Sequence, residues 1–93
     1  MAASIMQTEK ECYITHRTDN LHKHHIYFGN PGRRLSEQYG CWVWLTGEWH
    51  NQSNHGGHFD PVLDRKLKVE CQFKFEALHG HEEFMQVFGR SYI

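Results

Sequence analysis

The spacing of hydrophobic residues changes along the chain, from the alternation typical of strands in the first half to helical spacing in the second. We expect short strands at 12–15 and 21–28, joined by a turn at 17–20 that is rich in Asp and Asn. The run at 41–45 has the aromatic and β-branched residues of a third strand. Residues 1–10 show no periodicity, and we expect them to be a flexible, frayed lead-in.

Two short helical segments are expected beside these strands. Residues 36–39 can form one helical turn that Gly40 closes. Thr46 can cap a second short helix, which carries Glu48, Trp49 and His50 in its first turns.

The C-terminal part predicts two longer helices. Asp60 and Pro61 form a typical start, with Asp as N-cap and Pro at the first helical position, and Gly80 ends this helix. A last helix is expected over 81–88, ended by Gly89. The apolar stripe of the first of these helices is expected to face the core, and it comprises Leu63, Leu67, Cys71, Phe75 and Leu78, widened by Val62, Val69 and Phe73.

These elements predict a single small α+β domain over 1–93. No apolar run reaches the ~18 residues that would suggest a membrane span. The N-terminus lacks the basic and apolar regions of a signal peptide. We therefore expect a cytoplasmic protein that is not inserted in a membrane.

Charge and cysteine content limit the kinds of ligand site that the chain can form. The formal net charge is −1 with neutral histidines, so phosphate binding would need a local basic cluster or a metal. Cys12, Cys41 and Cys71 are widely spaced and form no CxxC pair. We expect them to be reduced thiols that pack in the core, in preference to metal ligands.

The chain has nine histidines, and most of them fall in two clusters. Neighbouring side chains on a strand point to opposite faces, so His24 and His25 cannot both bind one ion unless the strand bends or ends there. One would bind a metal and the other would exchange a proton; alternatively, one packs in the core and one is solvated. The second cluster, with His50, His55 and His58, can complete a metal site.

The order of these elements resembles the ββα-metal finger of the HNH (His-Me finger) endonucleases. In that order, a strand with a His doublet is followed by a loop, a second strand and a short helix that carries His. The closest resemblance is to small phage- and prophage-encoded HNH-type proteins that end in a Phe-Gly-[Arg/Lys]-X-Tyr segment. The matching segments are Leu21–Ile26, Val43–Asn51, His55–Phe59 and Phe84–Tyr92. The resemblance implies an HNH-like finger followed by two C-terminal helices.

It also implies roles for single residues. His24 matches a metal ligand, and His25 matches the general base that takes a proton from the attacking water. His50 matches the helix residue that closes the metal site. A third protein ligand would come from His58, or from His55 or Asn54.

The implied activity is metal-dependent hydrolysis of DNA phosphodiester bonds by a phage-encoded enzyme in the host cytoplasm. One divalent ion, Mg²⁺, Mn²⁺, Ni²⁺ or Zn²⁺, would stabilise charge on the phosphate; imidazole ligands favour the last three. Arg33 and Arg34 are the first candidates for phosphate contacts, with Lys66 and Lys68 second. An ordinary solvated charge pair is the alternative for the two arginines.

The chain departs from the family at two places. Many relatives bind a structural zinc through two CxxC pairs, whose positions here hold Cys12 with Thr15 and Thr46 with Trp49. Only one cysteine remains, so we expect no structural zinc, with tryptophan packing in its place. The Asn of the HNH triplet also has no clear counterpart, which affects how His25 would be oriented.

Two other functions remain open on the sequence. The first is a finger that no longer cleaves and instead binds nucleic acid or a host protein, for example as a phage inhibitor of a bacterial defence system. The second is a structural module in which His50, His55, His58 and one His of the doublet hold zinc in a closed tetrahedral set.

Overall fold

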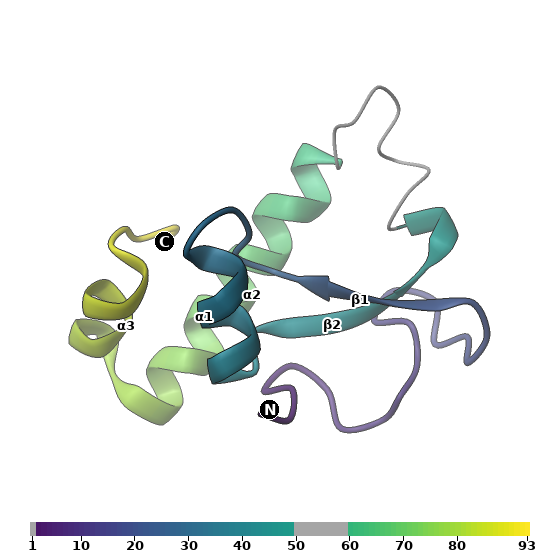
Figure 1. The fold of residues 1–93 in the computed structure, drawn as a ribbon, viewed down its shortest axis with the longest axis horizontal. Coiled ribbons are helices and arrows are strands. Elements are labelled where there is room, and N and C mark those ends of the chain that lie inside the picture. Colours follow the sequence, from purple (N-terminus) through teal and green to yellow (C-terminus); the bar gives the residue numbers. More distant parts are fainter. Residues whose placement is uncertain (1, 50–59) are drawn as a thin grey trace.

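Residues 2–49 and 60–93 are described by the structure, which is a computed structural model (Figure 1). Two antiparallel strands and three helices confirm the α+β class. Among the described residues, no helix is both long and apolar enough to cross a membrane. The elements are β1 (Leu21–His25), α1 (Gly32–Tyr39), β2 (Trp42–Thr46), α2 (Pro61–His79) and α3 (His81–Phe88).

The pairing of β1 with β2 sends the two histidines of the doublet in opposite directions. His25 is paired with Trp42 and His24 with Val43. Directly paired residues project from the same face of a sheet, and successive residues alternate between faces. His24 is buried on the face of Val43, whereas His25 lies on the opposite face, so the predicted opposite orientation of the two side chains is confirmed.

The strand predicted over 21–28 ends early, at His25. Ile26 N still donates to Cys41 O (2.9 Å), but the following residue, Tyr27, bonds to α1 instead of to β2. Ser36 Oγ accepts a hydrogen bond from Tyr27 N (3.0 Å) and donates one to Tyr27 O (2.7 Å). The helix predicted over 36–39 is correspondingly longer, since α1 begins at Gly32. Gly40 closes it in the left-handed conformation, as predicted.

The strand predicted at 12–15 is wrong: residues 13–15 form a turn. Cys12 O accepts a hydrogen bond from His16 N (2.9 Å), and Cys12 N donates one to Arg17 O (2.8 Å). These short-range bonds close the backbone on itself, so it is not available for a ladder. Tyr13 N is the backbone group of this turn that bonds to β2, where it donates to Trp44 O.

Residues 2–7, expected to be a frayed lead-in, run along the outer side of β2. Ser4 Oγ donates to Trp42 O (2.6 Å), and Trp44 N donates to Gln7 Oε1 (2.7 Å). The segment passes so close to Gly40 that a side chain there would come within 2.1 Å of a backbone oxygen. Residues 1–10 show no periodicity in the sequence, so these contacts were not expected.

Both ends of α2 follow the prediction. Asp60 caps it by accepting from Val62 N and Leu63 N, and Gly80 ends it. Residue 47 begins a helical stretch after Thr46, and the structure describes this stretch as far as 49. The core-facing residues of α2 are Leu63, Leu67, Cys71, Gln72 and Phe75.

The prediction that Val62, Phe73 and Leu78 of α2 face the core is wrong. Val62, Phe73 and Leu78 are 77%, 58% and 64% exposed. At roughly 100° per residue, Val62 and Phe73 project from the side of the helix opposite Leu67, so they could not widen its face. Leu78 lies in the last turn of α2. There Phe84 of α3 packs against Phe75, at a ring-centroid distance of 5.4 Å, and Leu78 remains exposed.

Candidate functional site

A histidine and a carboxylate meet where β1 ends beside α1. His25 Nε2 lies 2.8 Å from Glu37 Oε1, and both side chains are partly covered, at 15% and 32% exposure. The adjacent Ser36 is fully buried and bonded to Tyr27, which fixes α1 at the end of the strand. Glu37 is thereby held against His25.

Lys23 is the second cation on this carboxylate. Its Nζ lies 3.3 Å from Glu37 Oε2 and 4.2 Å from the centroid of the Trp42 ring. Strand alternation places it on the same face as His25, two residues away. The hydrogen bond from His25, aided by Lys23 and opposed by partial burial, lowers the pKa of Glu37, so the carboxylate is ionised near neutral pH.

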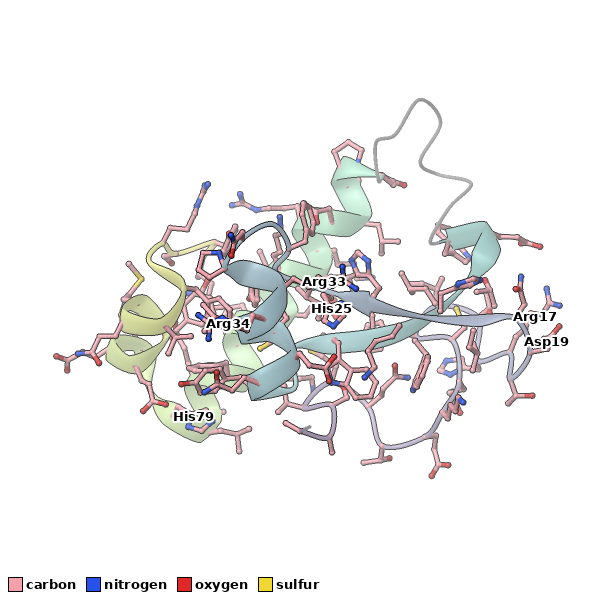
Figure 2. All side chains as sticks on the ribbon, in the orientation of Figure 1. Arg17, Asp19, His25, Arg33, Arg34 and His79 are labelled. Atoms are coloured by element: carbon pink, nitrogen blue, oxygen red, sulfur yellow. The ribbon has the colours of Figure 1, made fainter. Side chains whose placement is uncertain are left out.

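An open cavity of about 730 Å³ adjoins this pair. It is lined by His25 and Glu37 together with Arg33 and Arg34 from the first turn of α1. Figure 2 shows His25 and the two arginines gathered around α1. The predicted base and both predicted phosphate contacts therefore share one cavity.

The geometry determines which nitrogen of His25 can act as a base. A carboxylate accepts the Nε2–H proton, which favours the tautomer with a lone pair on Nδ1. Glu37 also stabilises the positive charge that would form when Nδ1 takes a proton. The pair is thus an imidazole whose tautomer and orientation are set by an ionised carboxylate.

Glu37 is the site residue that the sequence did not identify. It follows Arg33 by four residues, a spacing that puts both on one helical face. That signal could not be used, because the helix was expected to begin only at Ser36.

His24 lies apart from this cavity. It is 6% exposed on the opposite face of β1, with its ring centroid 6.5 Å from that of Phe28. The described parts of the chain contain no group of three or more His, Cys, Asp or Glu side chains that could hold a metal ion. The other predicted ligands, His50, His55 and His58, lie outside the described residues.

Three of the four positions that the resemblance gives to a structural zinc lie together. Cys12 Sγ accepts a hydrogen bond from Thr15 N (3.5 Å) and lies 4.0 Å from Thr46 Oγ1. Zinc in such sites requires Cys or His ligands, and two of these three positions hold hydroxyls. These residues do not fit a structural zinc.

The sulfur of Cys12 is instead surrounded by hydrogen-bond donors. Burial opposes formation of the thiolate, but hydrogen bonds from the Thr15 side chain and from backbone groups of Thr15, Thr46 and Ile14 outweigh it. Together they lower the pKa of Cys12 to about 7.

The second-choice phosphate contacts are placed less favourably than the arginines. Lys68 is only 15% exposed, and its Nζ lies 3.0 Å from Asp64 Oδ2, so its charge is already paired. Lys66 is exposed but lies on α2, and it does not line the His25 cavity.

No protein-family model, curated protein or solved structure matches this chain. The function of the site is therefore inferred from its own residues: a histidine held by a carboxylate, with two arginines in the same open cavity.

Proposed function

We propose that the protein is an HNH-like, metal-dependent endonuclease that hydrolyses phosphodiester bonds of DNA. The observation that carries this proposal is the joining of His25, Glu37, Arg33 and Arg34 in one cavity. These residues combine a candidate base, its orienting carboxylate and two guanidinium groups. Hydrolysis of an anionic ester requires a base to activate water and cations to bind the anion.

In the proposed reaction, His25 Nδ1 takes a proton from a water molecule as that water attacks the phosphorus atom. Glu37 keeps the imidazole in the required tautomer and stabilises its protonated form. This contact supplies the orientation that the resemblance assigns to the missing Asn. Glu37 is accordingly a positioning residue.

Arg33 and Arg34 would bind the phosphate oxygens. Guanidinium groups form paired hydrogen bonds with phosphate, and both arginines are exposed at the cavity. A chain with a net charge of −1 needs such a local cluster to attract a polyanion.

A divalent ion is part of the proposal through the ligands that the resemblance implies, His24, His50 and His58, with His55 as a further candidate. His24 lies on the face of β1 opposite the His25 cavity, so it would reach an ion at that cavity only where the end of the strand bends. When bound, it would stabilise negative charge on the phosphate and the leaving oxygen. Neutral imidazoles suit Mn²⁺, Ni²⁺ or Zn²⁺ better than Mg²⁺, which prefers oxygen ligands.

Nicking of supercoiled plasmid DNA in Mg²⁺, Mn²⁺, Ni²⁺, Zn²⁺ or EDTA tests this function. We expect metal-stimulated nicking by the wild type, none by His25→Ala, and a reduced kcat with little change in KM for Glu37→Gln. His81→Ala is the matched control, because His81 Nδ1 also pairs with a glutamate, Glu76, at 2.6 Å but on the surface of α3. Full activity of His25→Ala, or activity unaffected by EDTA, would contradict the proposal.

The Cys12 turn favours a second candidate function. Its hydroxyl neighbours Thr15 and Thr46 stand where relatives would hold zinc, so the finger has already lost one metal-binding element. Such a finger could bind nucleic acid or a host protein, for instance as a phage inhibitor of a defence system, without cleaving. Wild-type protein that binds DNA or a partner but never nicks plasmid in any metal would select this function.

A further inference from the structure

A second, smaller cavity lies on the other side of the loop that joins β1 to α1. Its volume is about 190 Å³, and its walls include the aromatic rings of Tyr27, Phe28, Phe88 and Tyr92. Tyr27 is central, with its ring centroid 4.4 Å from that of Phe88 and 5.4 Å from that of Tyr92. The cavity that these four rings help to line is called the aromatic cavity below.

Two of its aromatic residues, Tyr27 and Tyr92, are fixed by hydrogen bonds. Tyr27 Oη donates to Lys68 O (2.7 Å), and Tyr92 N donates to Gln72 Oε1 (2.7 Å). Phe28 differs, because it is 53% exposed on the loop after β1. An aromatic face open to solvent at the edge of a preformed cavity is a surface on which another planar ring can stack.

The aromatic cavity also contains a cation. Lys68 Nζ lies 4.3 Å from the centroid of the Phe28 ring and 5.5 Å from that of Tyr92. Its ion pair with Asp64 holds the ammonium group over these rings. A ring that stacks on Phe28 in this cavity would take the place of the ammonium group over the ring, and Lys68, displaced to the edge, would then donate a hydrogen bond to the polar edge of the ligand.

The two cavities are neighbours. Asn30 lines both of them, and both take lining residues from the loop at 26–31 and from the first turn of α1. One side offers His25 and two guanidinium groups for a phosphate, and the other offers rings and an ammonium group. A nucleotide has this same division into an anionic phosphate and a flat, polar-edged base.

We propose that the aromatic cavity receives one unstacked nucleobase of the DNA strand whose phosphate occupies the His25 cavity. This inference rests on the proposed function, since it takes the His25 cavity as the place where a phosphodiester binds. A base paired within a duplex cannot enter a space of this size between protein rings. The substrate class is therefore DNA in which a base is unpaired or easily unpaired, such as single strands, gaps, flaps or the strained duplex of supercoiled plasmid.

Binding of short oligonucleotides in EDTA tests the proposal without cleavage. The probe is a single strand with one 2-aminopurine, compared with the same sequence in a duplex and with a strand that carries an abasic site at that position. We expect the wild type to quench the 2-aminopurine fluorescence and to prefer the single strand. Phe28→Ala should lose the quenching and weaken single-strand binding by about 5- to 100-fold, the usual effect of removing one base-stacking ring.

Three controls sharpen the comparison. Phe28→Tyr should retain binding, because it keeps a stacking face. Phe73→Ala should behave as the wild type, since Phe73 is a similarly exposed aromatic residue (58%) on α2 outside either cavity. The abasic strand should bind wild type and Phe28→Ala equally, because the interaction to be lost is with the base.

The inference is overturned if the wild type leaves 2-aminopurine fluorescence unchanged, or if Phe28→Ala binds all three probes like the wild type. It is also overturned if Phe28→Ala weakens the abasic strand and the base-containing strand equally. Failure of the nuclease proposal gives a different pattern, in which plasmid nicking is absent while Phe28-dependent quenching persists. His25-dependent nicking without quenching would instead uphold the nuclease and reject the nucleobase site.

Discussion

Ser36 Oγ holds both backbone groups of Tyr27, accepting from its N–H at 3.0 Å and donating to its carbonyl oxygen at 2.7 Å. Both residues are buried, so no water can replace these bonds. The pair fixes the start of the loop after β1 to the middle of α1. Since Glu37 follows Ser36 directly, the same bonds set the position of the carboxylate that holds His25.

Replacement of Ser36 by alanine should therefore affect both stability and the site. It leaves the N–H of Tyr27 buried without its acceptor, and we expect a loss of about 1–3 kcal/mol in the free energy of unfolding. Urea denaturation measures this loss, and Thr18→Ala, at an exposed position before β1, should change it little. Nicking by Ser36→Ala should also fall under conditions where the variant is still folded; unchanged nicking would show that Glu37 is held by other contacts.

Acid stability should report the bond between Glu37 and His25. The folded-state pKa of Glu37 lies below its ordinary value, so the folded protein holds this proton less tightly than the unfolded chain. Its contribution to stability is present above the unfolded pKa and is lost as the pH falls through the folded pKa. The wild type should lose stability in the acid range more steeply than Glu37→Gln, as measured by urea unfolding at a series of pH values. Parallel curves for the two proteins would mean that the ion pair contributes nothing measurable.

Cys12 predicts a different pH dependence, on the neutral to alkaline side. Its pKa is about 7 in the fold against 9.0 in the unfolded chain, so the folded state releases this proton first. Stability should rise between pH 7 and pH 9, by up to about 2–3 kcal/mol, and be lost as the pH falls through 7. Cys12→Ser should remove this rise while leaving the acid range as in the wild type. A wild-type curve that is flat from pH 7 to 9 would show that the thiol stays protonated.

The two kinds of leucine on α2 give a test of the core. Leu67 is 1% exposed, whereas Leu78 is 64% exposed in the same helix. Leu67→Ala should cost about 2–5 kcal/mol through lost burial and the cavity left behind. Leu78→Ala should stay within about 0.5 kcal/mol of the wild type in the same denaturation experiment. Equal losses at both positions would mean that Leu78 is covered in solution.

Local signals explain which parts of the fold the sequence could predict. The bounds of α2 follow from Asp60, Pro61 and Gly80, whose effects act within one or two turns of the helix. The opposite directions of His24 and His25 follow from strand alternation alone. Residues 12–15 have the composition of a strand, but local hydrogen bonds at Cys12 close them into a turn.

The site was predictable to the extent that its residues signal their chemistry by type. His25, Arg33 and Arg34 were singled out from the sequence, and the fold brings them to one cavity. Glu37 escaped notice because its role depends on where α1 begins, and the first bonds of that helix, from Arg33 N to Gly29 O and from Leu35 N to Pro31 O, lie in a segment predicted to be a loop. The roles of His24, His50, His55 and His58 in metal binding stay predictions.

Residues 2–7, which run along β2, protect the protein from self-association through the edge of its sheet. In a two-stranded sheet each strand has a free edge, and an open edge can pair with a strand of another molecule. Here the Ser4 hydroxyl donates a hydrogen bond to the carbonyl of Trp42. Gln7 accepts one from the amide of Trp44, and Tyr13 N donates one to the carbonyl of Trp44. The outer edge of β2 is thus closed by the chain's own polar groups, and a protein truncated before Thr8 would expose a tryptophan-rich edge prone to aggregation.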